Sequence, residues 1–213
     1  MTLSTRYVDS IAFLGNLDSD WAALIDQVGP CRHDPKAARE PYEALVRAIA
    51  YQQLTAKAGD AMIDRLKTVV ADGDFPSPVH LVGAEFEAMR ACGFSAAKIA
   101  TIKAIAEGTL SGLVPAREVA AVMDDETLIA RLTTIKGIGR WTVEMLLMYS
   151  LERRDILPAD DFGIREGYRV LKSLDAQLKP RELRKIGEAW SPHRTVAAWY
   201  LWRIPRARGN VLE

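Results

Sequence analysis

The fold of this chain is decided by the stretch LTTIKGIGRWT, residues 132–142, in which two glycines stand two positions apart. Apolar residues recur at helical spacing over 124–133 before its turn and over 140–150 after it. The stretch therefore predicts a tight turn between two helices. Gly137 and Gly139 permit a positive φ angle and the close approach of another backbone, so this turn can bring a ligand near the main chain.

The start of the second helix favours a phosphate as that ligand. The first backbone N–H groups of a helix lack intrahelical partners and lie at the positive end of the helix dipole. A nucleic-acid phosphate binds at such a position without any reading of the base sequence. A plain helix–helix turn that requires glycine is the alternative interpretation of the same residues.

Helical periodicity extends over nearly the whole chain. Helices are predicted from about 41, from Thr55 as N-cap, and over 85–92, 95–110, 124–133, 140–150, 162–173, 180–189 and 193–203. The prolines within 75–80 are expected to interrupt the pattern. Since no alternation is long enough to indicate a strand, the sequence predicts an all-α protein of about ten helices.

Length and composition are those of an ordinary folded chain. The 213 residues are 49% hydrophobic and 26% charged, which excludes a disordered or collagen-like protein. No apolar run approaches the roughly 20 residues that cross a bilayer, and the first residues show no export signal. We therefore expect no membrane partner and a cytoplasmic location.

The charge distribution is uneven although the formal net charge is zero. Residues 179–213 contain eight Lys or Arg and three Glu, which gives this segment a net charge of +5. A positive C-terminal end can bind phosphates, and a solvated helix face is the alternative.

The two cysteines exclude one class of metal centre. Cys31 and Cys92 each stand alone, and His33, His80 and His193 are equally scattered. No pair has the spacing of zinc or iron–sulfur ligands, so a metal held by thiolates is excluded. Two isolated cysteines in a reducing compartment are expected to be packed thiols.

A second informative stretch, ILPADDFGI at residues 156–164, places two acids directly before a predicted helix. Taken alone, Asp160 and Asp161 are typical N-cap residues. A carboxylate is also the group that stabilises the positive charge developing on a sugar when a glycosidic bond breaks. A helix N-terminus favours the ionised form of such a carboxylate.

The string IKGIGRWT at 135–142, followed by these acids, resembles the helix–hairpin–helix DNA glycosylases, and most closely their alkylation-repair branch, DNA-3-methyladenine glycosylase II. The resemblance covers about 41–203. In these enzymes a catalytic aspartate follows the hairpin tryptophan position by about twenty residues, and Asp161 lies twenty residues after Trp141. Ala159 is one residue more than the related Pro-Asp-Asp string contains. The resemblance implies that Asp161 is catalytic and leaves Asp160 as the helix cap.

The resemblance also implies the domain organisation: two helical lobes that flank a cleft, within a single glycosylase unit over 1–213. One lobe is expected to combine residues from about 1–40 with the C-terminal helices. The central helix–hairpin–helix lobe is expected to span about 55–160. Trp190 and Trp199 are expected to fill the core, which is the usual place of a tryptophan in a helical protein.

A pocket for an extruded base is a further implication. The related enzymes stack the base on tryptophans at the positions of Trp141 and Trp202, and methylated purines are cationic, so an indole face attracts them. The other predicted pocket residues are Tyr51, Gln52, Met145 and Phe162. Because Met145 stands where a well-known relative has another aromatic residue, this pocket is expected to be roomier.

DNA contacts are implied for the hairpin and for the end of the helix from 41. Gln53 is expected to fill the gap left by the flipped nucleotide, with an exposed helix end as the alternative. The hairpin residues expected to contact DNA are Lys136, Gly137, Ile138, Gly139, Arg140 and Thr142. The backbone carbonyls of Thr133, Ile135 and Gly137 are the implied ligands of a Na⁺ or K⁺ ion, and no dissociable cofactor is required.

The residue at position 141 indicates whether the enzyme also cleaves the DNA strand. Family members that cut the DNA backbone carry a nucleophilic lysine there, whereas this chain has Trp141, and the cysteines of the iron–sulfur branch are absent. The sequence therefore predicts a monomeric, monofunctional glycosylase that releases 3-methyladenine- and 7-methylguanine-type bases from double-stranded DNA in base excision repair. A non-catalytic helix–hairpin–helix DNA-binding module is the alternative, and a helical interaction protein without DNA affinity is a more distant one.

Overall fold

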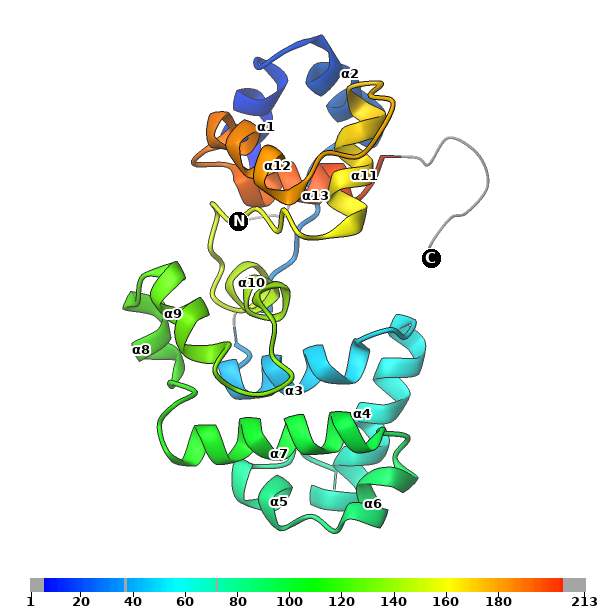
Figure 1. Ribbon diagram of the computed structural model, residues 1–213, viewed down its shortest axis with the longest axis vertical. Coiled ribbons are helices and arrows are strands. Elements are labelled where there is room, and N and C mark those ends of the chain that lie inside the picture. Colours follow the sequence, from blue (N-terminus) through cyan, green and yellow to red (C-terminus); the bar gives the residue numbers. More distant parts are fainter. Residues whose placement is uncertain (1–5, 37, 72, 205–213) are drawn as a thin grey trace. The chain divides into compact units, whose positions relative to one another are not determined.

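The structure is a computed structural model in which residues 6–36, 38–71 and 73–204 are described (Figure 1). Over these residues all regular secondary structure is helical and there is no strand, which confirms the predicted all-α class. The chain divides into two compact units. The central unit is Lys36–Leu151, and the terminal unit joins Met1–Pro35 to Glu152–Glu213.

The central unit is built around one long helix, α7. Its helices are α3 (Pro41–Tyr51), α4 (Ala56–Ala71), α5 (Pro78–Gly83), α6 (Phe86–Ala91), α7 (Ala96–Leu110), α8 (Arg117–Val122), α9 (Asp125–Leu132) and α10 (Arg140–Tyr149). Helix α7 packs against α3 on one side and α5 on the other, and α10 packs against α3 (Figure 1). Leu45, Ile102 and Leu147, one from each of α3, α7 and α10, are fully buried. The hairpin between α9 and α10 therefore rests on a packed three-helix core.

The terminal unit combines the two ends of the chain. Its helices are α1 (Val8–Gly15), α2 (Ser19–Val28), α11 (Phe162–Leu171), α12 (Pro180–Gly187), the short 3₁₀ helix η2 (Glu188–Trp190) and α13 (Arg194–Leu201). Trp21 of α2 meets Trp190 edge-on with ring centroids 5.4 Å apart. Trp190 and Trp199 are each only 3% exposed, so both tryptophans predicted to lie in the core do so.

The boundaries of the units differ from the predicted lobes. The central unit begins at Lys36 rather than about 55, and it ends at Leu151 rather than about 160. Helix α3 accordingly belongs with the hairpin, because it packs against both α7 and α10. The expectation that the first residues add helices to the other unit agrees with α1 and α2.

Two short helices, α5 and α8, were not predicted. The prolines within 75–80 interrupt the helical pattern as predicted, because α4 ends at Ala71 and the chain is non-helical over 73–77. Pro78 then starts α5, with Ser77 as its N-cap. The Ser77 hydroxyl accepts a hydrogen bond from the His80 N–H at 3.3 Å. Proline is favourable in the first turn of a helix because its missing N–H has no partner there in any case.

Neither unit contains a helix that could span a bilayer, among the residues that the structure describes. Cys31 and Cys92 are buried and free, and they lie in different units, as expected for packed thiols. Burial raises the pKa of the Cys31 thiol to about 11 and also raises that of Cys92, so both are poor nucleophiles near neutral pH.

Candidate active site

The predicted hairpin is a turn pinned by two buried isoleucines. Helix α9 ends at Leu132 and α10 begins at Arg140, with Gly139 as its N-cap. Ile135 and Ile138 are each 5% exposed, and the Ile138 N–H donates to the Ile135 carbonyl at 3.0 Å. The exposed members of the turn are Thr134, Lys136, Gly137 and Gly139. The backbone between the isoleucines is therefore presented at the surface of the central unit.

Gly137 and Gly139 are required for different reasons. Gly137 has a φ of +94°, and a Cβ at this position would lie 2.1 Å from Thr101 Oγ1 of α7. Gly139 has an ordinary φ of −95°, and a Cβ there would meet no atom within 4 Å. The positive φ that glycine permits is therefore adopted at Gly137 alone, whereas at Gly139 only the approach of a ligand can require glycine.

Arg140 forms ion pairs that hold the two helices of the hairpin together. Its guanidinium pairs with Glu126 of α9, and its Nε lies 2.9 Å from the Oε1 of Glu144, which is 2% exposed. The hydrogen bond with Glu126 is the main reason that the pKa of Arg140 is raised further above its usual value. Because Arg140 belongs to α10 and binds Glu126 of α9, it links the two helices of the hairpin. This structural role is separate from the DNA contact that was predicted for Arg140.

Two further hairpin residues are turned away from the surface. Thr142 was predicted to contact DNA, but its side chain is 3% exposed and its N–H donates to the Gly139 carbonyl at 3.0 Å. The Ile138 side chain is part of the core, as described above. The surface available to a phosphate is thus formed by Lys136 and the backbone around the two glycines.

Helix α7 also positions the predicted gap-filling residue. The Lys98 ammonium donates to the carbonyls of Ala50 and Gln52, both at 2.9 Å, and so caps the C-terminal end of α3. Gln53 follows with a φ of +60° and is exposed. Burial lowers the pKa of Lys98. Lys98 could not be identified from the sequence, because a lysine 46 to 48 residues away gives no local signal of a cap.

Tyr51 is held against α4 within the same unit. Its hydroxyl donates to Asp60, and a Cβ on Gly59 would lie 2.2 Å from the Tyr51 ring. Trp141 and Met145 lie one turn apart on α10, which places them on the same side of that helix. Trp141 is 36% exposed, which is unusual for a tryptophan in a packed unit and leaves part of its indole open to a ligand.

Asp161 is the N-cap of α11 in the terminal unit. Its Oδ1 accepts the Ile164 N–H at 2.9 Å and the Trp202 indole N–H at 2.9 Å. Asp160, which was expected to be the cap, forms a surface ion pair with Arg184 instead. The prediction that Asp160 caps this helix is therefore wrong. Asp161, to which the catalytic role is assigned, is itself the residue at the N-terminus of α11. Phe162, the next residue, is 60% exposed.

The predicted site residues thus form two groups, each within one unit. Asp161, Phe162 and Trp202 come together at the start of α11 and the end of α13 in the terminal unit. The central unit carries the remaining predicted residues: Tyr51, Gln52, Gln53, Trp141, Met145 and the hairpin with its carbonyls of Thr133, Ile135 and Gly137.

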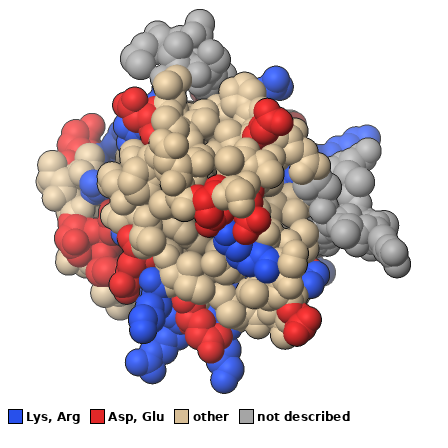
Figure 2. All heavy atoms as spheres, turned by 90° about the horizontal axis from the view of Figure 1, so that it is seen from above, with Lys and Arg blue, Asp and Glu red and all other residues tan. Residues whose placement is uncertain are grey.

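Two arginines of the basic C-terminal segment form ion pairs. Arg184 binds Asp160, Arg194 binds Asp155 with an Nε to Oδ1 distance of 2.7 Å, and Lys179 opens α12. Figure 2 shows Lys and Arg atoms next to Asp and Glu atoms on the face seen from above, without a continuous basic surface on that face.

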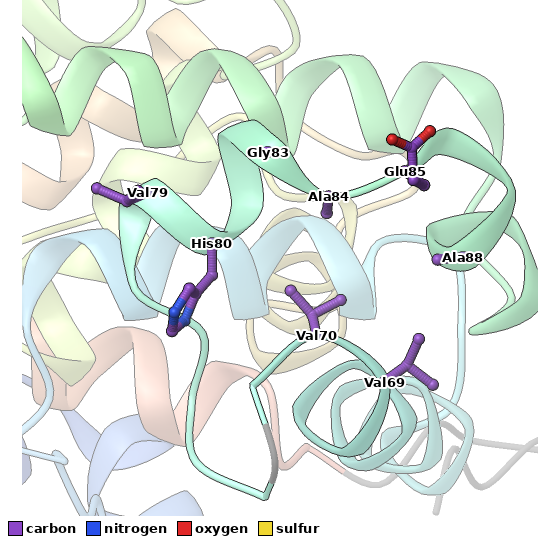
Figure 3. Close-up of a pocket in the computed structure, with 8 residues that line it drawn as sticks. All are labelled: Val69, Val70, Val79, His80, Gly83, Ala84, Glu85 and Ala88. Carbon is purple, nitrogen blue, oxygen red and sulfur yellow. The ribbon is translucent and has the colours of Figure 1, made fainter.

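A separate hollow of about 410 Å³ lies within the central unit between α4, α5 and α6 (Figure 3). Valine and alanine side chains line most of it, with His80 and Glu85 at its edge. None of the predicted site residues borders this hollow.

Comparison with known proteins defines the class. Residues 46–193 match the HhH-GPD superfamily of base excision DNA repair proteins, and the chain belongs to that family. It is 50% identical to DNA-3-methyladenine glycosylase 1 of Schizosaccharomyces pombe over 91% of this chain and 85% of that protein. It is 35% identical to the alkylbase DNA glycosidase-like protein mag2 of the same yeast, over 97% of each chain.

Solved structures agree with these relatives. The S. pombe 3-methyladenine DNA glycosylase in complex with abasic DNA matches with a TM-score of 0.83 and 49% identity, over 92% of this chain and 95% of that one. A DNA-3-methyladenine glycosidase from Bacillus halodurans matches with a TM-score of 0.80 and 34% identity, over 93% and 89% of the two chains. The family resemblance inferred from the hairpin and the aspartate is confirmed.

Proposed function

We propose that this chain is a monofunctional DNA glycosylase that flips alkylated purines out of duplex DNA and hydrolyses their N-glycosidic bond, a DNA-3-methyladenine glycosylase of base excision repair. The observation that carries the proposal is the Asp161 carboxylate, which is fixed at the N-terminus of α11 by two N–H donors in a chain that also has the glycine hairpin. Its relatives of known structure include an enzyme bound to abasic DNA, the product of such a reaction.

Asp161 supplies the charge that the reaction requires. Departure of the base leaves positive charge on the deoxyribose, as in other glycoside cleavages. A fixed carboxylate below the sugar stabilises that charge and can orient or deprotonate the attacking water. Because Oδ1 is already held by Ile164 and Trp202, little reorganisation is needed when the charge develops.

The aromatic residues supply recognition of the base. An extruded 3-methyladenine or 7-methylguanine is cationic, and the exposed face of Trp141 offers it a cation–π contact. Extrusion costs a few kcal/mol of stacking and pairing, least for a damaged base. Since the cationic base is a good leaving group, a site with one carboxylate and an aromatic wall is sufficient.

The hairpin is proposed to bind DNA phosphates through its backbone, with a Na⁺ or K⁺ ion shaping the turn. The carbonyls of Thr133, Ile135 and Gly137 are the proposed ligands, and neutral carbonyl oxygens suit such hard cations. The Ile135 carbonyl also accepts the Ile138 N–H, which leaves it a second lone pair for an ion. If the ion contributes, duplex affinity measured at constant ionic strength falls when K⁺ and Na⁺ are replaced by tetramethylammonium.

The experiment that tests the function is incubation with methylated duplex DNA and chromatography of the released bases. The proposal predicts free 3-methyladenine and 7-methylguanine, with strand breaks appearing only after alkaline or heat treatment. Borohydride should trap no covalent adduct, because Trp141 offers no amine at the position of the lyase lysine. Trapping by the unmodified protein would show that another amine, such as Lys136, reaches the sugar.

The alternative of a non-catalytic DNA-binding module makes a different prediction. Such a module binds duplex DNA through the hairpin and releases no base, and loss of Asp161 leaves its only activity unchanged. A cytoplasmic location and a monomeric state also remain predictions, which fractionation and light scattering can check.

A further inference from the structure

The hydrogen bond between Trp202 and Asp161 assigns the indole a role beyond stacking. Trp202 is the C-cap of α13, and its Nε1–H donates to Asp161 Oδ1 at 2.9 Å. The same oxygen accepts the Ile164 N–H at 2.9 Å. Two donors on one oxygen fix the carboxylate about its side-chain torsions, and a hydrogen bond to an ionised acceptor is among the stronger kinds.

Two glycines on α11 allow the indole to come this close. Gly163 and Gly167 are four residues apart and therefore share one side of the helix. A Cβ on Gly167 would lie 2.2 Å from the backbone carbonyl oxygen of Leu201, the residue before Trp202. A Cβ on Gly163 would lie 3.2 Å from Trp202 Cδ1 and 3.1 Å from Asp161 Oδ1. The end of α13 thus packs directly on the α11 backbone.

The residues on both sides of Trp202 hold the end of α13 in place. Tyr200 is fully buried, and its hydroxyl donates to the Gly29 carbonyl at 2.9 Å. Leu201 is 1% exposed. The guanidinium of Arg203 lies 3.6 Å from the centroid of the Trp199 ring. Trp202 is partly exposed. Its packed neighbours hold the backbone that places the indole N–H beside Asp161.

We propose that Trp202 is a positioning residue for Asp161. The missing side chains at Gly163 and Gly167 set the distance between the Trp202 indole and the Asp161 carboxylate. This inference rests on the proposed function, since it concerns the aspartate assigned there. Without the indole N–H the carboxylate gains rotational freedom, and misplacement of a catalytic group slows chemistry by about ten- to a hundredfold. The binding of DNA, which depends on the hairpin, is not expected to change.

Two variants disturb the hydrogen bond in different ways. Trp202→Phe removes the N–H and keeps an aromatic face for stacking. Gly163→Ala keeps both side chains but introduces a methyl group at 3.1 to 3.2 Å from their closest atoms. Gly83→Ala is the matched control, because it is also a helical glycine and a Cβ there meets no atom within 4 Å. Each protein is compared with the wild type for folding, DNA affinity and base release.

The proposal predicts that Trp202→Phe and Gly163→Ala lower the single-turnover rate of 7-methylguanine release by about tenfold or more. Their affinity for duplex DNA containing a stable abasic analogue should remain within about twofold, and Gly83→Ala should match the wild type in both assays. A purely structural role for Trp202 would instead lower affinity and thermal stability together. A Trp202→Phe enzyme with the wild-type rate would overturn the inference and leave Trp202 with stacking alone.

A spectroscopic measurement tests the hydrogen bond without activity. The chain has five tryptophans, so the indole N–H signal of Trp202 is identified in a ¹H–¹⁵N spectrum by its loss in Trp202→Phe. Asp161→Asn should move that signal upfield, because the charged acceptor is gone; an unmoved signal would overturn the inference. Failure of the proposed function is a different result: the wild-type chain would then release no base from methylated duplex DNA, whatever the Trp202 signal does.

Discussion

Replacement of Gly137 by alanine tests how the hairpin is built. The new methyl group would occupy a residue with a φ of +94° and lie 2.1 Å from Thr101 Oγ1. A left-handed or otherwise sparsely populated conformation costs an L-residue about 1–3 kcal/mol. Overpacking a tight contact costs about 1–3 kcal/mol more. The lower entropy of the unfolded alanine chain returns about 0.4–1 kcal/mol.

The free energy of unfolding of Gly137→Ala is therefore expected to fall by about 1–5.5 kcal/mol, with a central value of about 3 kcal/mol, because the strain and contact costs exceed the entropy gain. Gly139→Ala is the matched control two residues away. It has an ordinary φ and no atom within 4 Å of the added Cβ, so its change should stay within about 0.5 kcal/mol, since poorer N-capping and lower chain entropy oppose each other. Urea unfolding followed by circular dichroism measures both values.

A double variant separates the contact from the backbone strain. Thr101→Ala removes the hydroxyl and methyl that the new Cβ would meet, at the cost of the Oγ1 hydrogen bond to the Ala97 carbonyl at 3.1 Å. Combined with Gly137→Ala it should destabilise less than the sum of the single changes, by about 1–2 kcal/mol. A Gly137→Ala protein within 0.5 kcal/mol of the wild type, or equal losses at both glycines, would refute this account of the turn.

Three further predictions concern the pocket, the DNA contact and the thiols. Trp141→Ala should reduce excision of cationic bases more than it reduces duplex binding, because it removes a stacking face; equal losses in the two assays would place Trp141 in the core instead. Duplex affinity should fall as salt rises from about 50 to 200 mM, with a logarithmic slope of about −0.9 for each phosphate neutralised, and an unchanged affinity would argue against phosphate contacts. Cys31 and Cys92 should react with a thiol reagent at pH 7.5 only on unfolding, since burial raises both thiol pKa values, and rapid labelling of the folded chain would contradict their packing.

Features with a local physical cause could be predicted from the sequence. The helices on either side of the hairpin begin and end within one or two residues of the prediction, because the glycines and the apolar spacing specify both ends. Asp161 was predicted to be catalytic from its chain distance to the hairpin, which matches the related family, and this role stays a prediction. Trp190 and Trp199 were placed in the core correctly, since large aromatic residues on helices are usually buried.

Features set by long-range packing could not be predicted. The prediction that Asp160 is the cap was wrong, because its side chain pairs with Arg184, which lies 24 residues further along the chain. The roles of Lys98 at the end of α3 and of Gly163 and Gly167 beside α13 depend on helices that meet only in the folded unit. Arg140 was predicted to contact DNA from its place in the motif, whereas its guanidinium also binds Glu126 of α9, 14 residues earlier in the chain.

The most direct test of the central claim is base release by Asp161→Asn. Asparagine is as good an N-cap as aspartate, so the variant should fold and bind duplex DNA while its rate of 7-methylguanine release falls at least about a hundredfold. Asp160→Asn is the matched control; it loses only an exposed ion pair with Arg184 and should keep the wild-type rate. Near-wild-type release by Asp161→Asn, or loss of release by Asp160→Asn alone, would contradict the assignment of the catalytic carboxylate.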